Sequence, residues 1–139
     1  MRPILLLLCS LACCLPACQT TSNHQFAAPA SGWQVKTGQL AYTDSKLSLI
    51  GELLVRSSKS GDFEMTFTKA GGMTLITLRQ DASFGEISGP LARGGWSGET
   101  AKAPARLRGW FVLRDKIMAA RKAATLRHES GEQSFTLRF

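Results

Sequence analysis

The stretch Lys102–Arg127, KAPARLRGWFVLRDKIMAARKAATLR, decides the fold, because it holds the only convincing helical pattern in the chain. Apolar residues recur in it at spacings of three and four, as they do along one buried helical stripe; they are Leu107, Trp110, Leu113, Ile117 and Ala120. Pro104 suits the first turn of such a helix, where its missing N–H loses no hydrogen bond. We therefore predict one amphipathic helix near residues 104–122.

The same stretch carries the whole net charge of the protein. It contains eight basic residues and one acidic residue, which accounts for the formal charge of +7, while charges in the rest of the sequence balance. A basic surplus favours anionic partners. Arg114 and Arg121 fall on the flank of the apolar stripe, where they could snorkel or meet an anion. The alternative is that these charges form a solvated back of the helix.

Outside the helix, short runs alternate apolar with polar residues, which is typical of half-buried strands. The clearest is Phe63–Thr68, and the others are Trp33–Thr43, Lys46–Ser57, Met73–Gln80, Ser83–Ser88, Thr125–Glu129 and Gln133–Phe139. Gly89–Ala103 is rich in glycine and is predicted to be irregular. Short connections indicate antiparallel pairing, because parallel pairing needs long crossovers. We predict an α+β fold, with a strongly curved antiparallel β-sheet or half-open barrel of 6–8 strands on one main helix.

The apolar sides of this sheet and helix should face each other. The residues expected there are Leu53, Val55, Phe63, Met65, Phe67, Leu107, Trp110, Leu113, Ile117, Phe135 and Leu137. One helix covers only part of such a sheet. The interior is therefore either a filled core, with the sheet curled tightly around the helix, or a cavity for a hydrophobic ligand.

The N-terminus has the features of a secretory signal peptide. Arg2 supplies a positive charge, and the apolar run Ile4–Leu15 is shorter than the roughly twenty residues that cross a membrane. The run ends in Leu15-Pro16-Ala17-Cys18, which resembles the lipobox of bacterial lipoproteins. In that family the cysteine is acylated, with palmitate among the acyl groups, and cleavage occurs just before it. Cys13 is an alternative acylation site, and an ordinary signal peptide with incidental cysteines is the other alternative.

The resemblance implies three segments and an address. Residues 1–17 would be the signal peptide, residues 18–32 the lipidated Cys18 with a flexible tether, and residues 33–139 a single domain. His24, in the tether, is expected to be solvated. In lipoproteins a residue other than aspartate after the cysteine, here Gln19, favours the outer membrane. The expected location is thus the bacterial cell envelope, lipid-anchored at the outer membrane and facing the periplasm.

Catalytic and metal-binding patterns are missing from the sequence. The acidic residues are scattered among predicted strands and turns, and none is paired with a histidine by spacing. No cysteine follows Cys18, and His24 and His128 are too far apart in sequence to form a ligand motif. We therefore expect no enzymatic activity, no metal and no cofactor. Nucleic acid is not an expected partner, because a protein with this address would rarely meet it.

Three segments carry a second resemblance, which spans most of the mature chain: Gly51–Arg56, Gly61–Thr68 and Gly89-Pro90-Leu91. Together with the lipobox they resemble the lipoprotein-localisation (Lol) factors, nearest the outer-membrane lipoprotein receptor of that group. The resemblance implies binding of an acyl chain or other hydrophobic envelope component, in lipoprotein or lipid handling. The partners would be the membrane, through the anchor, and acyl chains or another lipoprotein. The alternative is a structural or adaptor lipoprotein with a filled core, which binds an envelope protein through its surface.

Overall fold

The computed structural model describes residues 23–139, in which one α-helix packs against eight strands. The predicted signal peptide and Cys18 lie outside the described residues. The strands are β1 (Gln34–Thr43), β2 (Ser48–Ser57), β3 (Phe63–Lys69), β4 (Met73–Gln80), β5 (Phe84–Ser88), β6 (Trp96–Glu99), β7 (Thr125–Ser130) and β8 (Gln133–Arg138). The helix α1 spans Ala105–Ala119, and the short 3₁₀ turns η1 and η2 span Pro90–Ala92 and Thr100–Lys102.

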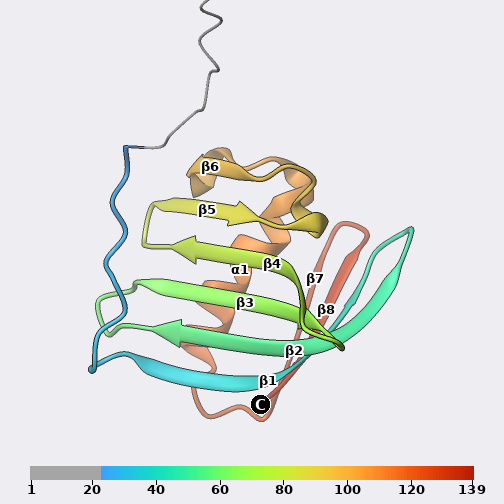
Figure 1. Cartoon of the computed structure of the whole chain (residues 1–139), viewed down its shortest axis with the longest axis horizontal. Coiled ribbons are helices and arrows are strands. Elements are labelled where there is room, and N and C mark those ends of the chain that lie inside the picture. The colour runs from blue at the N-terminus through green and yellow to red at the C-terminus, as the bar shows by residue number, and fades with distance from the viewer. Residues whose placement is uncertain (1–22) are drawn as a thin grey trace, which may run out of the picture.

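All eight strands belong to one antiparallel sheet, in the order β6-β5-β4-β3-β2-β1-β8-β7. The first six strands form a meander. The chain then passes through α1 and returns as the β7–β8 hairpin, which adds to the free side of β1. The sheet curls so that α1 lies against its inner face, and the edge strands β6 and β7 do not pair with each other (Figure 1). The predicted α+β class and curved antiparallel sheet are confirmed.

The helix is shorter than its sequence pattern suggests. It begins directly after Pro104 and leaves helical geometry at Ala120, where φ is −100° and ψ is 43°. Arg121 and Lys122, predicted to be helical, lie instead in the turn that leads to β7. Their alanine-rich surroundings favour helix. However, the chain must reverse there so that β7 can join the sheet.

The glycine-rich stretch is less irregular than predicted. β6 lies within it and pairs with β5, with Trp96 opposite Ile87 and Gly98 opposite Gly85. Glycine weakens an isolated strand, so the sequence carries little β signal here. Tertiary contact compensates, because the Trp96 ring lies edge-on to Phe111 of α1 at 5.4 Å.

Residues 23–32 contain no helix or strand. The prediction that His24 is solvated is wrong, because its side chain is partly buried against the domain. One of its ring nitrogens lies 2.5 Å from the carboxylate of Asp81, and its ring stacks on Phe84. The segment runs across one end of the sheet (Figure 1). Its contacts are taken up below.

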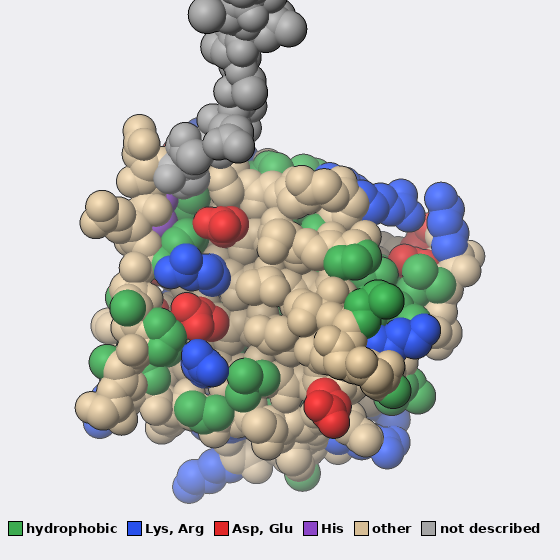
Figure 2. All heavy atoms as spheres, viewed as in Figure 1, with side chains coloured by type: hydrophobic (Ala, Val, Ile, Leu, Met, Phe, Trp, Pro, Cys, Tyr) green, Lys and Arg blue, Asp and Glu red, His purple; other side chains and the backbone are tan. Residues whose placement is uncertain are grey.

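The outer face of the sheet is mainly polar, although Val35 of β1 and Ile50 of β2 are exposed on it. Figure 2 shows mainly uncharged polar side chains and backbone over the middle strands, with a column of alternating acidic and basic side chains at one side. The register places Arg56, Glu64, Arg79 and Glu86 opposite one another on β2 to β5. Such a face needs no second layer, and most of the large apolar side chains lie on the helix side.

Candidate functional site

The interior predicted as a cavity or core is filled with side chains. All eleven residues named from the sequence are buried, each with at most 3% of its surface exposed. A cavity large enough for a water molecule would leave accessible surface on the side chains around it. Six further side chains are at most 1% exposed and belong to the same core: Leu40, Ile76, Leu78, Ile87, Ala92 and Ala103.

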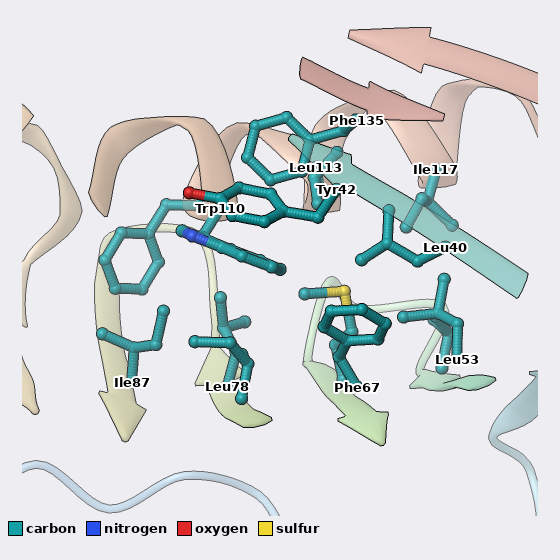
Figure 3. Packing of buried hydrophobic residues seen from close by; sticks show 14 of the residues in the cluster. Leu40, Tyr42, Leu53, Phe67, Leu78, Ile87, Trp110, Leu113, Ile117 and Phe135 are labelled. Atoms are coloured by element: carbon teal, nitrogen blue, oxygen red, sulfur yellow. The ribbon is translucent and has the colours of Figure 1, made fainter. Parts of the chain in front are cut away.

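Trp110 is the centre of this core. Its ring lies 4.9 Å from Phe135 in an edge-to-face arrangement, 5.0 Å from Tyr42 and 6.2 Å from Phe67. These partners come from β8, β1 and β3, so a single side chain of α1 links three strands (Figure 3). Edge-to-face and offset aromatic contacts of this kind stabilise beyond the area they bury.

A pocket of about 280 Å³ opens at one end of the domain. It lies between the β1–β2 turn, the β7–β8 turn, η1 and the first turn of α1. Its lining residues are Tyr42, Asp44, Ser45, Leu91, Arg93, Ala105, Arg106, Ser130, Gly131, Glu132 and Gln133. The pocket is therefore built from four segments far apart in the sequence, and most of its lining residues are polar or charged, with Leu91 and Ala105 among them.

A chain of hydrogen bonds forms one wall of this pocket. The Gln133 side-chain amide donates to the Tyr42 hydroxyl at 3.0 Å, and that hydroxyl donates to the Asp44 carboxylate at 2.9 Å. Burial and the hydrogen bond to Asp44 raise the pKa of Tyr42 to about 12. Hydrogen bonds from the Lys46 backbone N–H, the Tyr42 hydroxyl and the Leu47 N–H hold the pKa of Asp44 below its usual range. Near neutral pH the wall thus presents a neutral phenol beside a carboxylate.

Two arginines and a glutamate complete the charge of the pocket. Arg106 donates to the carbonyl of Ala92 at 2.6 Å, which ties α1 to η1. Arg93 is exposed, has left-handed backbone geometry (φ 51°, ψ 59°), and makes no ion pair with any residue from 23 to 139. Glu132 is exposed at the β7–β8 turn. Both signs of charge are available at the rim, which suits a polar partner better than a hydrocarbon chain.

The single tyrosine of the chain makes this wall testable. A raised pKa in the folded state means that neutral Tyr42 contributes stability below pH 10, the usual value. That contribution is lost as the pH rises through 10 toward 12. We expect tyrosinate absorbance to appear near pH 12 in the folded protein and near pH 10 in denaturant. Asp44→Asn should lower the pKa of Tyr42 in the folded protein, but not as far as the usual value of 10, since burial is the larger cause of the shift. Titration of Tyr42 near pH 10 in the folded protein would contradict its burial and hydrogen bonding in this wall.

Arg114 and Arg121, the two arginines predicted to contact an anion, lie in different environments. Arg114 is only 13% exposed and donates through Nε and Nη2 to the carbonyl of Gly61, at 2.9 and 2.8 Å. Its Nη1 lies 2.6 Å from the carboxylate of Asp115. Arg121 is exposed beyond the end of α1, and its carbonyl accepts a bond from Lys36. Arg114 therefore holds α1 to the β2–β3 turn, and of these two arginines Arg121 is the one whose side chain is exposed at the surface.

This difference predicts unequal effects of substitution. Arg114→Ala removes two charged hydrogen bonds and leaves a partly buried carbonyl without its donor, so unfolding free energy should fall by about 2 kcal/mol. Arg121→Ala, the matched control, should change it by less than about 0.5 kcal/mol. Chemical denaturation of both variants measures the contrast. Equal effects would contradict the structural role of Arg114.

Several basic side chains of the helix form hydrogen bonds within the domain, which the sequence does not indicate. Arg106, Arg108 and Arg114 all donate to backbone carbonyls, of Ala92, Ala103 and Gly61 respectively. These acceptors belong to the segments before α1 and to a distant turn. Sequence spacing could not reveal them, because a surface arginine and a bonded one have the same pattern.

The pocket was also beyond the reach of sequence reasoning. Tyr42 and Gln133 lie 91 residues apart, and only the pairing of β8 with β1 brings them together. A lone tyrosine just before an Asp-containing turn was the one available signal, and it did not indicate a partner.

No protein-family model matches this chain, and a search of the curated proteins finds no match either. Within residues 23–139, no helix is long and apolar enough to cross a membrane. In the same part of the chain, His, Cys, Asp and Glu side chains do not gather in threes as metal ligands would. The proposed function below therefore rests on the sequence features and the geometry of this domain.

Proposed function

We propose that this protein is a non-enzymatic envelope lipoprotein, anchored through Cys18, which binds an envelope component through its surface. The support for the anchor is the signal-like N-terminus and the resemblance of Leu15–Cys18 to a lipobox. Gln19 favours the outer membrane, with the domain facing the periplasm. Several acyl chains would make such an anchor stable, since each buried methylene adds about 0.8 kcal/mol.

The filled core is the observation that supports the proposal of surface binding rather than an internal acyl-chain site. Side chains from α1 and the sheet occupy the interior, with at most 3% exposed among the eleven residues considered for a cavity. A lipid tail there would have to displace Trp110 or its aromatic partners. The pocket beside Tyr42, by contrast, is open, and most of its lining residues are polar or charged. It is therefore the place where we propose that a partner binds.

The pocket also supports binding without catalysis. The Tyr42 phenol, whose pKa is about 12, is a poor base near neutral pH. The Asp44 carboxylate already accepts hydrogen bonds from Tyr42, Lys46 and Leu47. These groups are engaged in shaping the wall and its turn, which leaves them poorly placed to move protons on a substrate.

Two measurements in cells test the two halves of the proposal. Radioactive palmitate should label the wild-type protein and not Cys18→Ala. A photo-crosslinking amino acid at Ser45, on the pocket rim, should yield a defined adduct, whereas the same group at the exposed Thr77 on the outer sheet face should not. Labelling that persists in Cys18→Ala would refute the anchor. Equal adducts at both positions, or none at Ser45, would refute the pocket as the binding surface.

A further inference from the structure

The segment of residues 23–32, here called the strap, is held to the domain by its histidine. A ring nitrogen of His24 lies 2.5 Å from Oδ2 of Asp81, and the imidazole stacks on Phe84 with ring centres 4.2 Å apart and an angle of 14°. Both partners are in or next to the β4–β5 turn. The histidine side chain is only 29% exposed. It thus combines a polar contact with an aromatic one at a single site.

Phe26 adds a second point of attachment. Its ring lies 4.8 Å from the His24 ring, nearly edge-on, and 6.0 Å from Phe84. The guanidinium of Arg79 lies 5.0 Å from the centre of the same ring, a distance typical of a cation–π contact. Arg79 in turn lies 3.5 Å from Glu64 on β3. The strap therefore contacts side chains that the sheet itself holds in place.

The receiving turn is fixed independently of the strap. Oδ1 of Asp81 accepts hydrogen bonds from the backbone N–H groups of Ser83 and Phe84, at 3.0 and 2.9 Å. Partial burial acts to raise the pKa of Asp81, but these bonds and the contact with His24 outweigh it and leave the pKa below its usual range. The carboxylate is consequently ionised near neutral pH. Its second oxygen, Oδ2, is the one that meets His24.

The strap and the pocket lie at opposite ends of the domain. β4 ends at Gln80, beside Asp81, while β1 starts at Gln34 on the same end and reaches Tyr42 at the other. Figure 1 shows the strap crossing the end at which the β4–β5 turn lies, whereas the β1–β2 and β7–β8 turns are at the far end. Eight residues of β4 at about 3.3 Å each separate the two ends by roughly 25 Å.

We propose that the docked strap sets the orientation of the domain on its own membrane, with the Asp81 end toward the lipid and the Tyr42 pocket away from it. This inference rests on the proposed acylation of Cys18. A free tether from Cys18 to Trp33 could extend about 50 Å, at 3.3–3.6 Å per residue. With His24 docked, only six residue steps remain, which limits the distance from the anchor to His24 to about 20 Å. The pocket is then presented to partners on the side facing away from the anchor.

Docking is tested first by proteolysis after Phe26 in the full chain carrying Cys18→Ala. Chymotrypsin cleaves after aromatic residues and needs a locally released backbone, so a docked strap should be cut slowly. His24→Ala should raise the rate of cleavage after Phe26 by about tenfold or more, because the population of the open strap rises. Gln25→Ala, an exposed position in the same strap, is the matched control and should leave the rate unchanged. No acceleration in His24→Ala would overturn docking.

Orientation is tested with the acylated full chain in phosphatidylethanolamine–phosphatidylglycerol vesicles. No cysteine follows Cys18, so Ala82→Cys at the Asp81 end and Ser45→Cys at the pocket each introduce one labelling site. Energy transfer to a headgroup-labelled lipid should be at least about twofold higher from position 82 than from position 45, given the roughly 25 Å between the ends. His24→Ala should abolish the difference, and Gln25→Ala should keep it. Equal transfer from the two positions with His24 intact would overturn the orientation.

The two tests separate this inference from the proposed lipid anchor. Palmitate labelling that persists in Cys18→Ala would refute the anchor and with it the orientation, while the proteolysis result would still decide whether the strap docks. Loss of labelling together with equal energy transfer would leave the anchor standing and refute the orientation alone.

Discussion

Trp110→Ala is expected to lower the free energy of unfolding by about 3–5 kcal/mol, the range for deleting a large aromatic side chain from a core. The indole is 1% exposed and contacts rings from three strands. Its removal takes away those contacts and leaves a void that the neighbouring rings can fill only in part. Urea unfolding, followed by far-ultraviolet circular dichroism, measures the loss without depending on tryptophan emission.

Val112→Ala is the matched control, because it changes the same helix on its outer side, where Val112 is 38% exposed. It should cost less than about 1 kcal/mol. A Trp110→Ala loss as small as that of Val112→Ala would mean that the interior is loosely packed. A small apolar ligand that binds only to the Trp110→Ala protein would, in contrast, support the filled wild-type core.

Gly38→Ala is expected to destabilise the protein by about 3 kcal/mol, the upper part of the range for overpacking. A Cβ at this position would collide with the carbonyl oxygen of Arg138 and lie 3.1 Å from the Cα of Phe139. Both atoms are backbone at the end of β8, so no side-chain rotation can relieve the contact. Either β8 moves away from β1 or β1 bends, and the β7–β8 hairpin is attached to the sheet through that pairing.

Gly32→Ala is the matched control for this substitution, since no atom lies within 4 Å of its Cβ position. It should leave the free energy of unfolding unchanged within about 0.5 kcal/mol. Amide hydrogen exchange of β8 should rise in Gly38→Ala and stay unchanged in Gly32→Ala. Normal protection of β8 in Gly38→Ala would show that the close approach to Arg138 is not needed.

Much of the architecture could be predicted because local pattern and tertiary role agree in most elements. Phe63, Met65 and Phe67 alternate with polar residues and all face the core, as period two requires. The helix stripe of Leu107, Trp110, Leu113 and Ile117 is likewise buried throughout. In these elements the local sequence preferences agree with the tertiary contacts, so the elements can be predicted from the sequence alone.

The remaining features depend on contacts between distant segments. β6 forms in a glycine-rich stretch because β5 and Phe111 support it, which no local propensity indicates. Arg114 looked like a surface cation, and its acceptor at Gly61 is 53 residues away. The docking of His24 on Asp81 joins residues 57 apart. Such pairings become visible only once the fold has placed their partners.

The helix that dominates the sequence is thus chiefly a core element. Its apolar side fills the curl of the sheet, and several of its basic side chains fasten it to the segments around it. Several of the basic side chains that suggest an anionic partner therefore already donate hydrogen bonds within the domain. This shifts the proposed binding surface from the helix to the pocket at the end of the sheet.

Native mass spectrometry of the full-length wild-type protein, extracted from envelopes and released from detergent in the gas phase, tests the filled core most directly. We predict a mass that corresponds to the chain with its covalent acyl groups and no further stoichiometric lipid. One non-covalent lipid per chain, retained by the wild type, would contradict the account and restore an internal acyl-chain site.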